Sequence, residues 1–283
     1  MIKKVGVVGA GQMGNGISHV FALHGYQVVM YDVSDAQLDK ALKTIEKNLG
    51  RQVKSGVIKE EQIKETLKNI TPTTKLEDVA DVDFCVEAAP ENEELKKDLF
   101  KKLDETVKEG TILASNTSSI SITMLSAQTK RPDKVIGMHF MNPVPVMKLV
   151  EVIRGLATSE ETYNTVLELA RSLDKDPALA KDYPGFIVNR ILIPMINEAI
   201  CVLYEGIATK EDIDKGMKLG TNQPMGPLVL ADFIGLDTVL AIQNVLYNGF
   251  KDPKFRPCPL LVKMVESGRL GRKVGKGFYD YTK

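Results

Sequence analysis

A strand, a glycine-rich turn and a helix follow one another at the start of this chain, and this succession constrains the fold most. The β-branched run 2–8 leads into Gly9-Ala10-Gly11-Gln12-Met13-Gly14 and then into an apolar helix ending near Gly25. A second strand at 27–31 ends at Asp32. A GxGxxG motif between a strand and a helix, with an acid about 20 residues on, is the fingerprint of a dinucleotide-binding βαβ unit.

Each part of the fingerprint has a physical role. The first glycine permits the tight turn, the second lets backbone approach a pyrophosphate, and the third lets helix pack on strand. The N–H groups at the helix start face the phosphates. The acid accepts hydrogen bonds from ribose hydroxyls and repels a 2′-phosphate, which favours NAD (NADH) over NADP. A ligand-free glycine turn is the alternative. The cofactor-binding candidates are Gly9, Gly11, Gln12, Met13, Gly14 and Asp32.

Strands and helices continue to alternate through the first two thirds of the chain. We expect strands at 83–89, 111–115, 135–136 and 149–153, and helices at 34–68, 91–107 and 158–173. Alternation of this kind predicts an α/β fold with a doubly wound, mostly parallel sheet of the Rossmann type. Ligands bind such sheets beyond the carboxyl ends of the strands. The polar residues expected at those ends are Asp32, Glu91, Ser118 and His139.

His139 and Glu151 are separated by a segment that we expect to reverse the chain. Pro143 and Pro145 favour a turn, because proline fixes φ and disfavours helix before itself. The returning strand can bring Glu151 beside His139. A carboxylate on one ring nitrogen fixes the tautomer and stabilises the imidazolium, while the other nitrogen moves a proton. The alternative is a satisfied histidine at a strand end, but the convergence of polar residues favours function.

Cationic residues form a stripe along the predicted helix at 34–68. They step by three or four positions: Lys40, Lys43, Lys47, Arg51 and Lys54. A basic stripe is usually a solvated helix face. In an otherwise neutral protein it could also receive a polyanionic part of a substrate, such as phosphates.

The strand pattern stops near 182–185, which predicts a domain boundary there. We therefore expect an NAD-binding Rossmann-type domain at 1–183 and a helical substrate and dimerisation domain at 184–283. Helices are predicted at 186–204, where Pro194 would kink the helix, and at 209–220, 228–247 and 260–265. The helical domain is apolar enough to form a dimer interface.

Composition excludes several classes of function. Lysine plus arginine equals aspartate plus glutamate at 37 each, so we expect no nucleic-acid partner. The three cysteines lack metal-ligand spacing and indicate buried thiols in a reducing compartment, with no metal. The most apolar run, 186–203, carries polar and charged residues, so we expect no membrane span. A strand from the first residues leaves no room for a targeting peptide, which predicts a cytoplasmic protein.

Five motifs occur in the order of one known family: Ser115-Asn116-Thr117-Ser118-Ser119, His139-Phe140-Met141-Asn142-Pro143, Val150-Glu151, Pro184-Gly185-Phe186-Ile187-Val188-Asn189-Arg190 and Gly275-Lys276-Gly277-Phe278-Tyr279. The chain resembles the L-3-hydroxyacyl-CoA dehydrogenases from end to end, and among them the bacterial 3-hydroxybutyryl-CoA dehydrogenases. The resemblance implies a His-Glu acid/base pair, His139 and Glu151, that serves hydride transfer between a short-chain 3-hydroxyacyl-CoA and NAD.

The resemblance also implies roles for other residues. Ser118 would bond the reacting oxygen, Asn189 would hold the substrate from the second domain, and Asn142 would lie near the nicotinamide end. Further cofactor contacts would come from Glu91, Lys96, Ser118 and Lys273. The substrate set would be Ser118, Asn142, Asn189, Arg51 and Lys54, with the last two near the coenzyme A. An acyl-CoA substrate and a homodimer are implied as well. The alternatives are a dehydrogenase of free 3-hydroxy acids and a non-catalytic NAD-binding protein like the lens crystallins that resemble this family.

Overall fold

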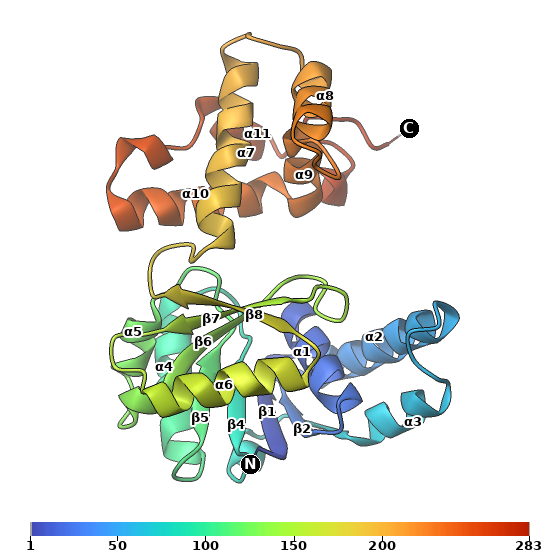
Figure 1. The fold of residues 1–283 in the computed structure, drawn as a ribbon, viewed down its shortest axis with the longest axis vertical. Coiled ribbons are helices and arrows are strands. Elements are labelled where there is room, and N and C mark those ends of the chain that lie inside the picture. The colour runs from blue at the N-terminus through green and yellow to red at the C-terminus, as the bar shows by residue number, and fades with distance from the viewer. Residues whose placement is uncertain (1, 283) are drawn as a thin grey trace. The chain divides into compact units, whose positions relative to one another are not determined.

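The computed structural model describes residues 2–282 of the chain. These residues form two compact units, the first extending to Tyr183 and the second beginning at Pro184 (Figure 1). The division falls inside the segment 182–185, where the strand pattern of the sequence stops.

The first unit is built on one eight-stranded sheet. Its strands are β1 (Lys4–Val8), β2 (Gln27–Tyr31), β3 (Ile70–Thr73), β4 (Phe84–Glu87), β5 (Ile112–Ser115), β6 (Val135–Phe140), β7 (Leu149–Arg154) and β8 (Asp176–Lys181). Their order across the sheet is β3-β2-β1-β4-β5-β6-β7-β8. All neighbouring strands are parallel except β6 and β7. The predicted doubly wound, mostly parallel sheet is therefore confirmed.

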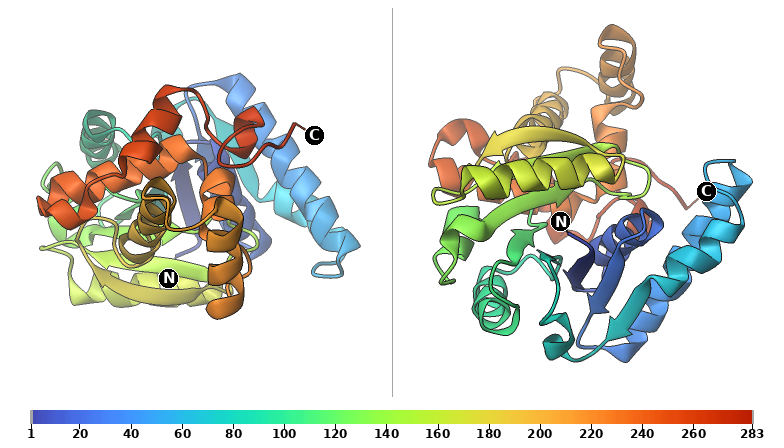
Figure 2. Two further views of the ribbon diagram at one scale, coloured as in Figure 1. Left: turned by 90° about the horizontal axis from the view of Figure 1, so that it is seen from above. Right: turned by 60° about the horizontal axis from the view of Figure 1, so that its bottom comes forward.

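Helices cover both faces of this sheet, which explains why its inner strands are largely apolar, whereas the edge strands β3 and β8 are partly exposed. One face shares a continuous core with α1 (Gln12–Leu23), α2 (Asp35–Lys54) and α6 (Glu160–Ser172). In Figure 1, α6 crosses β6, β7 and β8, and Figure 2 shows the same layer from another side. The other face is covered by α5 (Ile122–Ser126), with α4 (Glu93–Thr106) packed beside it.

The prediction of one helix over 34–68 is wrong. The structure has two helices there, α2 and α3 (Glu61–Lys68), separated by residues 55–60. Gly56 takes φ +72°, a conformation that ends a helix easily only at glycine. Within α2 the apolar stripe packs as expected, and Leu38, Ile45 and Leu49 are buried.

Two strands, β3 and β8, were not predicted from the sequence. β3 contains Pro72 and β8 contains Pro177, and each strand lies at an edge of the sheet. Proline is tolerated on edge strands because one side of the backbone needs no ladder partner.

The second unit is helical. It contains α7 (Val188–Tyr204), α8 (Lys210–Gly220), α9 (Pro227–Ile234), α10 (Leu236–Phe250) and α11 (Pro259–Glu266), and short 3-10 helices occur in the two units at Leu76–Val79, Pro132–Lys134, Pro253–Phe255 and Arg272–Val274. Thr209 caps α8 by accepting a hydrogen bond from the Asp212 N–H, as its position predicts. The region predicted to be helical at 228–247 is helical, but it contains two helices, because Gly235 at φ +102° separates α9 from α10 with a 98° bend.

A buried aspartate fixes the glycine-rich tail onto the helices of this unit. Asp232 is fully buried, and its oxygens accept hydrogen bonds from the Phe278 and Tyr279 N–H groups at 2.9 Å each. A Cβ at Gly277 would lie 1.9 Å from the Asp232 carboxylate. Glycine is therefore needed there for a close approach.

Among residues 2–282, no single helix is both long and apolar enough to cross a membrane. α9 and α10 reach that length and hydropathy only when taken together, across their bend.

Candidate active site

The glycine turn after β1 lies against the loop after β4, at the point where the strand order reverses. Gly9 has φ +104°, and a Cβ there would lie 2.7 Å from the Ala88 carbonyl oxygen. A Cβ at Gly14 would lie 1.7 Å from the Gly9 carbonyl oxygen, so α1 can pack on β1 only with glycine at this position. At Gly11 a Cβ would meet no protein atom within 4 Å, which fits a backbone approached by a ligand.

The start of α1 suits an anion. Gly11 is its N-cap residue, no side chain caps the helix, and no acid lies in the first turn. The N–H groups of Gln12, Met13 and the residues after them therefore point toward the carboxyl edge of the sheet without a carboxylate beside them. Asp32 stands at the end of β2, where Oδ2 accepts a hydrogen bond from the Ala10 N–H at 2.8 Å. This bond ties the ribose-binding candidate to the phosphate-binding turn.

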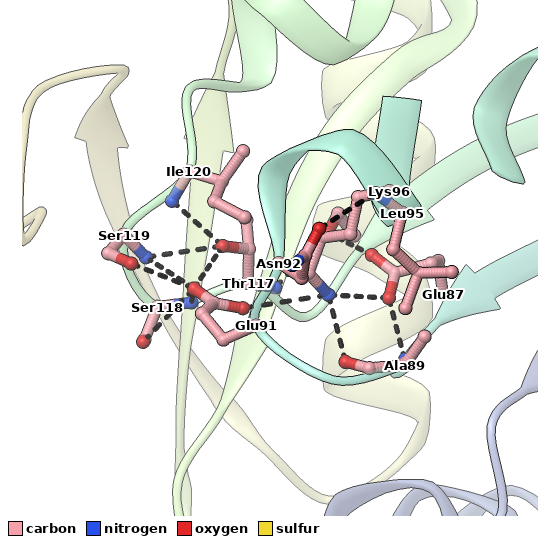
Figure 3. A network of polar contacts seen from close by, with 11 residues as sticks. Glu87, Ala89, Glu91, Asn92, Leu95, Lys96, Thr117, Ser118, Ser119 and Ile120 are labelled. Atoms are coloured by element: carbon pink, nitrogen blue, oxygen red, sulfur yellow. Dashed lines mark hydrogen bonds and ion pairs between the residues drawn. The ribbon is translucent and has the colours of Figure 1, made fainter. Parts of the chain in front are cut away.

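Glu91 binds the loop after β5 through several hydrogen bonds to one of its carboxylate oxygens (Figure 3). Its Oε1 accepts hydrogen bonds from Thr117 Oγ1 at 2.5 Å, the Ser118 N–H at 3.0 Å and Ser119 Oγ at 2.8 Å. Burial alone would raise the pKa of Glu91, but the Lys96 ammonium and these hydrogen bonds outweigh it and lower the pKa. The structure thus brings together two predicted cofactor contacts, Glu91 and Ser118.

Lys96 is more deeply buried than Glu91, and its ammonium lies between Glu91 and Glu87 (Figure 3). Its side chain is 1% exposed, and its Nζ lies 2.5 Å from Glu87 Oε1, 3.0 Å from the Ala89 carbonyl oxygen and 3.5 Å from Glu91 Oε2. Ser115 Oγ donates to the other Glu87 oxygen at 2.6 Å. Because its ammonium is enclosed by acceptors, Lys96 shapes the loop after β4 in this structure. A direct contact between Lys96 and the cofactor stays a prediction.

His139 and Glu151 lie directly opposite each other in the antiparallel pair β6–β7. His139 Nδ1 is 2.7 Å from Glu151 Oε2, and the two side chains are 10% and 0% exposed. A buried carboxylate needs a charged or donating partner, and the Nδ1–H group supplies one. With the Nδ1 proton held by Glu151, Nε2 becomes the ring nitrogen that can exchange a proton. Phe140 N–H donates to Asn116 Oδ1 at 2.9 Å, which joins the ends of β5 and β6.

Residues 141–148, here called the proline loop, connect β6 to β7. Asn142 at its start accepts a hydrogen bond from Gln12 Nε2 at 3.2 Å, so the loop reaches the start of α1. Val144 packs on α1 at Gly16, where a Cβ would come within 2.9 Å of the valine. The buried Lys175 donates to the carbonyl oxygens of Val144 at 2.6 Å and Met147 at 2.8 Å. Burial lowers the pKa of Lys175 to about 8.

A cavity of about 860 Å³ lies in the first unit beside the proline loop. Its walls come from the end of α1, from α2 and the turn after it, from α3, from the proline loop and from the turn before β8. Arg51 lines this cavity, as do Lys148 and Lys175. Lys54 is exposed and lies outside the lining, while Lys40, Lys43 and Lys47 border a separate, shallow hollow along α2. The predicted cationic stripe is thus divided between two surfaces.

The two remaining candidates belong to the second unit. Asn189 lies in the first turn of α7. Lys273 Nζ donates to Asp237 Oδ2 at 2.6 Å, at the start of α10. Among the residues that the structure describes, no three or more His, Cys, Asp or Glu side chains are grouped as metal ligands would be.

Four residues that organise this site were not predicted from the sequence. Glu87 and Thr117 support the Glu91 network, Asn116 joins β5 to β6, and Lys175 anchors the proline loop. Glu87, Asn116 and Thr117 lie next to predicted residues, but no spacing rule singles them out. Nothing in the sequence identifies Lys175 as part of the site, because a lysine before an unpredicted strand cannot be distinguished from a surface lysine.

Fold and site geometry together define an NAD-binding α/β protein that carries a buried His-Glu pair. Residues 4–183 match the family model described as "3-hydroxyacyl-CoA dehydrogenase, NAD binding domain", and residues 185–281 match the model of the C-terminal domain of the same family.

Relatives with similar sequences span the whole chain. A 3-hydroxybutyryl-CoA dehydrogenase of Bradyrhizobium diazoefficiens is 57% identical over 99% of this chain and 96% of its own length. One from Clostridioides difficile is 54% identical over 99% and 100%. The crystal structure of the (S)-3-hydroxybutyryl-CoA dehydrogenase from Ralstonia eutropha is 53% identical, covers 100% of both chains and superposes with a TM-score of 0.97.

The chain belongs to the 3-hydroxyacyl-CoA dehydrogenase family. It is an NAD-dependent oxidoreductase, and the predicted cofactor NAD(H) is confirmed. The residues present fit that cofactor, because the open backbone at Gly11, the uncapped start of α1 and the carboxylate of Asp32 offer what a pyrophosphate and a ribose need.

Proposed function

We propose that this protein interconverts (S)-3-hydroxybutyryl-CoA and acetoacetyl-CoA with NAD(H). The observation that carries the proposal is the buried hydrogen bond of 2.7 Å between His139 Nδ1 and Glu151 Oε2. The names of relatives at 54–57% identity support the short acyl chain.

In this mechanism His139 is the general base. NAD supplies the hydride acceptor when bound. His139 Nε2 takes the proton of the 3-hydroxyl group as C3 becomes a carbonyl, and it returns the proton in the reverse direction. Glu151 keeps Nδ1 protonated and stabilises the imidazolium that forms, which is why a fully buried carboxylate beside the ring is useful.

Three polar residues would hold the substrate for this step. Ser118 would donate to the reacting oxygen, and its place in the Glu91 network fixes its backbone for that task. Asn142, tied to Gln12 at the start of α1, would lie near the nicotinamide end. Asn189 would contribute from the second unit.

The cavity beside the proline loop would take the coenzyme A arm. Its size suits a large ligand, and Arg51, Lys148 and Lys175 give it a cationic lining suited to phosphates. Of the two cations predicted for this task, Arg51 is therefore supported by its position and Lys54 is not.

Assembly and pathway remain proposals. We propose a homodimer formed through the helical unit, where large side chains such as Ile207, Leu219 and Phe233 are 68%, 73% and 59% exposed. Light scattering coupled to size exclusion would report the mass directly, and a monomer would contradict the proposal. We place the reaction in the metabolism of short fatty acyl thioesters in the cytoplasm.

NADH oxidation with acetoacetyl-CoA tests the function, with free acetoacetate and NADPH in parallel. Turnover with the thioester and NADH alone is the expected result. Turnover with the free acid would move the protein to the dehydrogenases of free 3-hydroxy acids. NADH binding without turnover of either substrate would indicate a non-catalytic, crystallin-like protein.

Two variants test the residue roles. His139→Gln should lower kcat by about 10²–10⁴-fold, the usual contribution of a positioned base, with little change in NADH binding. Glu151→Gln should lower kcat severely, because the imidazolium loses its partner. Wild-type activity in Glu151→Gln would contradict the pair, and an equal loss of NADH affinity in His139→Gln would contradict a purely acid/base role.

A further inference from the structure

The cavity beside the proline loop is lined by three side-chain amides, Asn48, Gln52 and Gln62. In each of them the carbonyl oxygen is already bonded to another residue. Asn48 Oδ1 accepts from Arg51 Nη1 at 3.3 Å, and Gln62 Oε1 accepts from the Lys59 N–H at 2.9 Å. Gln52 Oε1 lies 2.9 Å from His19 Nε2. Each oxygen therefore has one of its two lone pairs engaged, and the three NH₂ groups, which can only donate, are the larger part of what these amides offer a ligand.

The charged residues of the lining also favour a ligand that accepts hydrogen bonds. Its cations are Arg51, Lys148 and Lys175, and its one carboxylate, Asp174, forms an ion pair with Lys148. An ammonium has three donors, and Lys175 uses two of them on the Val144 and Met147 carbonyl oxygens. The cavity thus offers hydrogen-bond donors and few acceptors to whatever it binds.

The orientation of the Gln52 amide follows from His19. His19 is fully buried, and within residues 2–282 its Nδ1 has no hydrogen-bond partner. A buried N–H without a partner is rarer and more costly than a buried acceptor without one, so the proton belongs on Nε2. Nε2 then donates to Gln52 Oε1, and the amide nitrogen of Gln52 is turned away from His19.

Burial lowers the pKa of His19 to about 4, with Lys175 and His24 acting in the same direction. His19 therefore stays neutral at physiological pH, with its single ring proton on Nε2.

We propose that Gln52, oriented by His19, determines specificity for the coenzyme A arm by donating its amide N–H to an acceptor oxygen of that arm. The inference rests on the proposed function, since it concerns the same substrate. The acceptor is a carbonyl oxygen of the pantetheine portion or an oxygen of the nucleotide phosphates. In this scheme His19 is a positioning residue, which acts only through Gln52.

The direct test is Gln52→Glu, which keeps the size of the side chain and replaces its donor by a carboxylate oxygen. We expect the Kd for free coenzyme A, measured by titration calorimetry, to rise about tenfold or more, the usual effect of losing one hydrogen bond and gaining repulsion. The KM for acetoacetyl-CoA should rise by a similar factor, and by far more than the KM for NADH. The matched control is Gln27→Glu, outside the cavity at the start of β2, which should leave both constants unchanged.

Two substitutions of His19 distinguish its role in orienting the Gln52 amide from its contribution to packing. His19→Gln retains a donor near the position of Nε2 and should keep the wild-type Kd for coenzyme A. His19→Leu removes the donor, lets the Gln52 amide turn over, and should raise that Kd several-fold. Equal affinities in these two variants would overturn the positioning role.

Pantetheine distinguishes the two sources of the acceptor. If Gln52→Glu weakens pantetheine binding as much as coenzyme A binding, the acceptor is a carbonyl oxygen. If only coenzyme A binding weakens, it is a phosphate oxygen. A wild-type Kd for coenzyme A in Gln52→Glu, with an active wild-type enzyme, would overturn this inference alone. A wild-type protein that neither binds coenzyme A nor turns over its thioester would overturn the proposed function, and this inference with it.

Discussion

Replacement of His19 by glutamine should change how the stability of this protein depends on pH. Burial is the main reason that the pKa of His19 falls from 6.5 to about 4 in the folded protein, and the hydrogen bond to Gln52 offsets only part of the effect. Between these two values the unfolded chain binds a proton that the folded chain does not. Stability therefore rises with pH across this window, and falls as the solution is acidified from about 6.5 toward 4.

The size of the effect follows from the same two values. Since one pKa unit corresponds to about 1.4 kcal/mol, acidification from pH 7 to pH 5 should cost the wild type about 2 kcal/mol through His19. By pH 4 the cost should reach about 3 kcal/mol. His19→Gln carries no titrating group at this position, so it should escape this part of the loss. Glutamine also keeps a donor for Gln52, which limits the structural change.

Urea unfolding followed by circular dichroism at pH 7 and pH 5 would measure this difference, since the chain has no tryptophan. The wild type should lose about 2 kcal/mol more than His19→Gln between the two values. His24→Gln serves as the control, because it leaves His19 in place and removes only the smallest of the influences that lower its pKa, so it should show nearly the wild-type loss. Parallel pH profiles for the wild type and His19→Gln would refute the assignment of a neutral, buried His19.

Three further substitutions test other parts of the structure. Lys96→Met leaves a buried carboxylate without its cation and should cost about 3–5 kcal/mol in urea unfolding, whereas Lys97→Met on the exposed face should cost nothing measurable; equal stabilities would contradict the buried network. Gly14→Ala places a Cβ 1.7 Å from a carbonyl oxygen and should abolish tight NADH binding in a fluorescence titration, while Gly50→Ala, with open space around it, should stabilise α2 by about 0.5–1 kcal/mol. Asp232→Leu should release the C-terminal tail to limited proteolysis, and an unchanged digestion pattern would contradict the docking.

The strands and helices of the first unit could be predicted wherever the hydrophobic pattern of the sequence matches the burial of the element in the fold. β1, β2, β4 and β5 are buried on both faces, so their apolar runs identify them, and the glycine fingerprint sets the position of α1. The edge strands β3 and β8 escaped prediction because exposure and proline remove that signal. The break at 55–60 and the bend at Gly235 depend on positive φ at single glycines within otherwise helical sequence.

The site residues at the ends of strands could be predicted from the sequence. The residues that hold these site residues in place by hydrogen bonds and ion pairs were harder to predict. His139 and Glu151 emerged from the expected reversal at two prolines, and the structure pairs them. Sequence alone could not tell that Lys96 is buried, because its neighbours Lys97 and Glu94 belong to an exposed helix face. Nor could it separate Arg51 from Lys54, which lie on adjacent turns of α2 and differ only in which of them reaches the cavity.

The antiparallel pairing of β6 with β7 also restricts how the proline loop can vary. Side chains along a strand alternate between the two faces of the sheet. The number of residues between His139 and Glu151 therefore determines whether the two side chains lie on the same face. If one residue were inserted and the pairing slipped by one position, Val150 would stand opposite His139 and Glu151 would turn into the apolar core. Attempts to reshape the neighbouring cavity through this loop should therefore exchange residues at constant length, because a change in length puts the proton-transfer pair at risk before it alters the cavity.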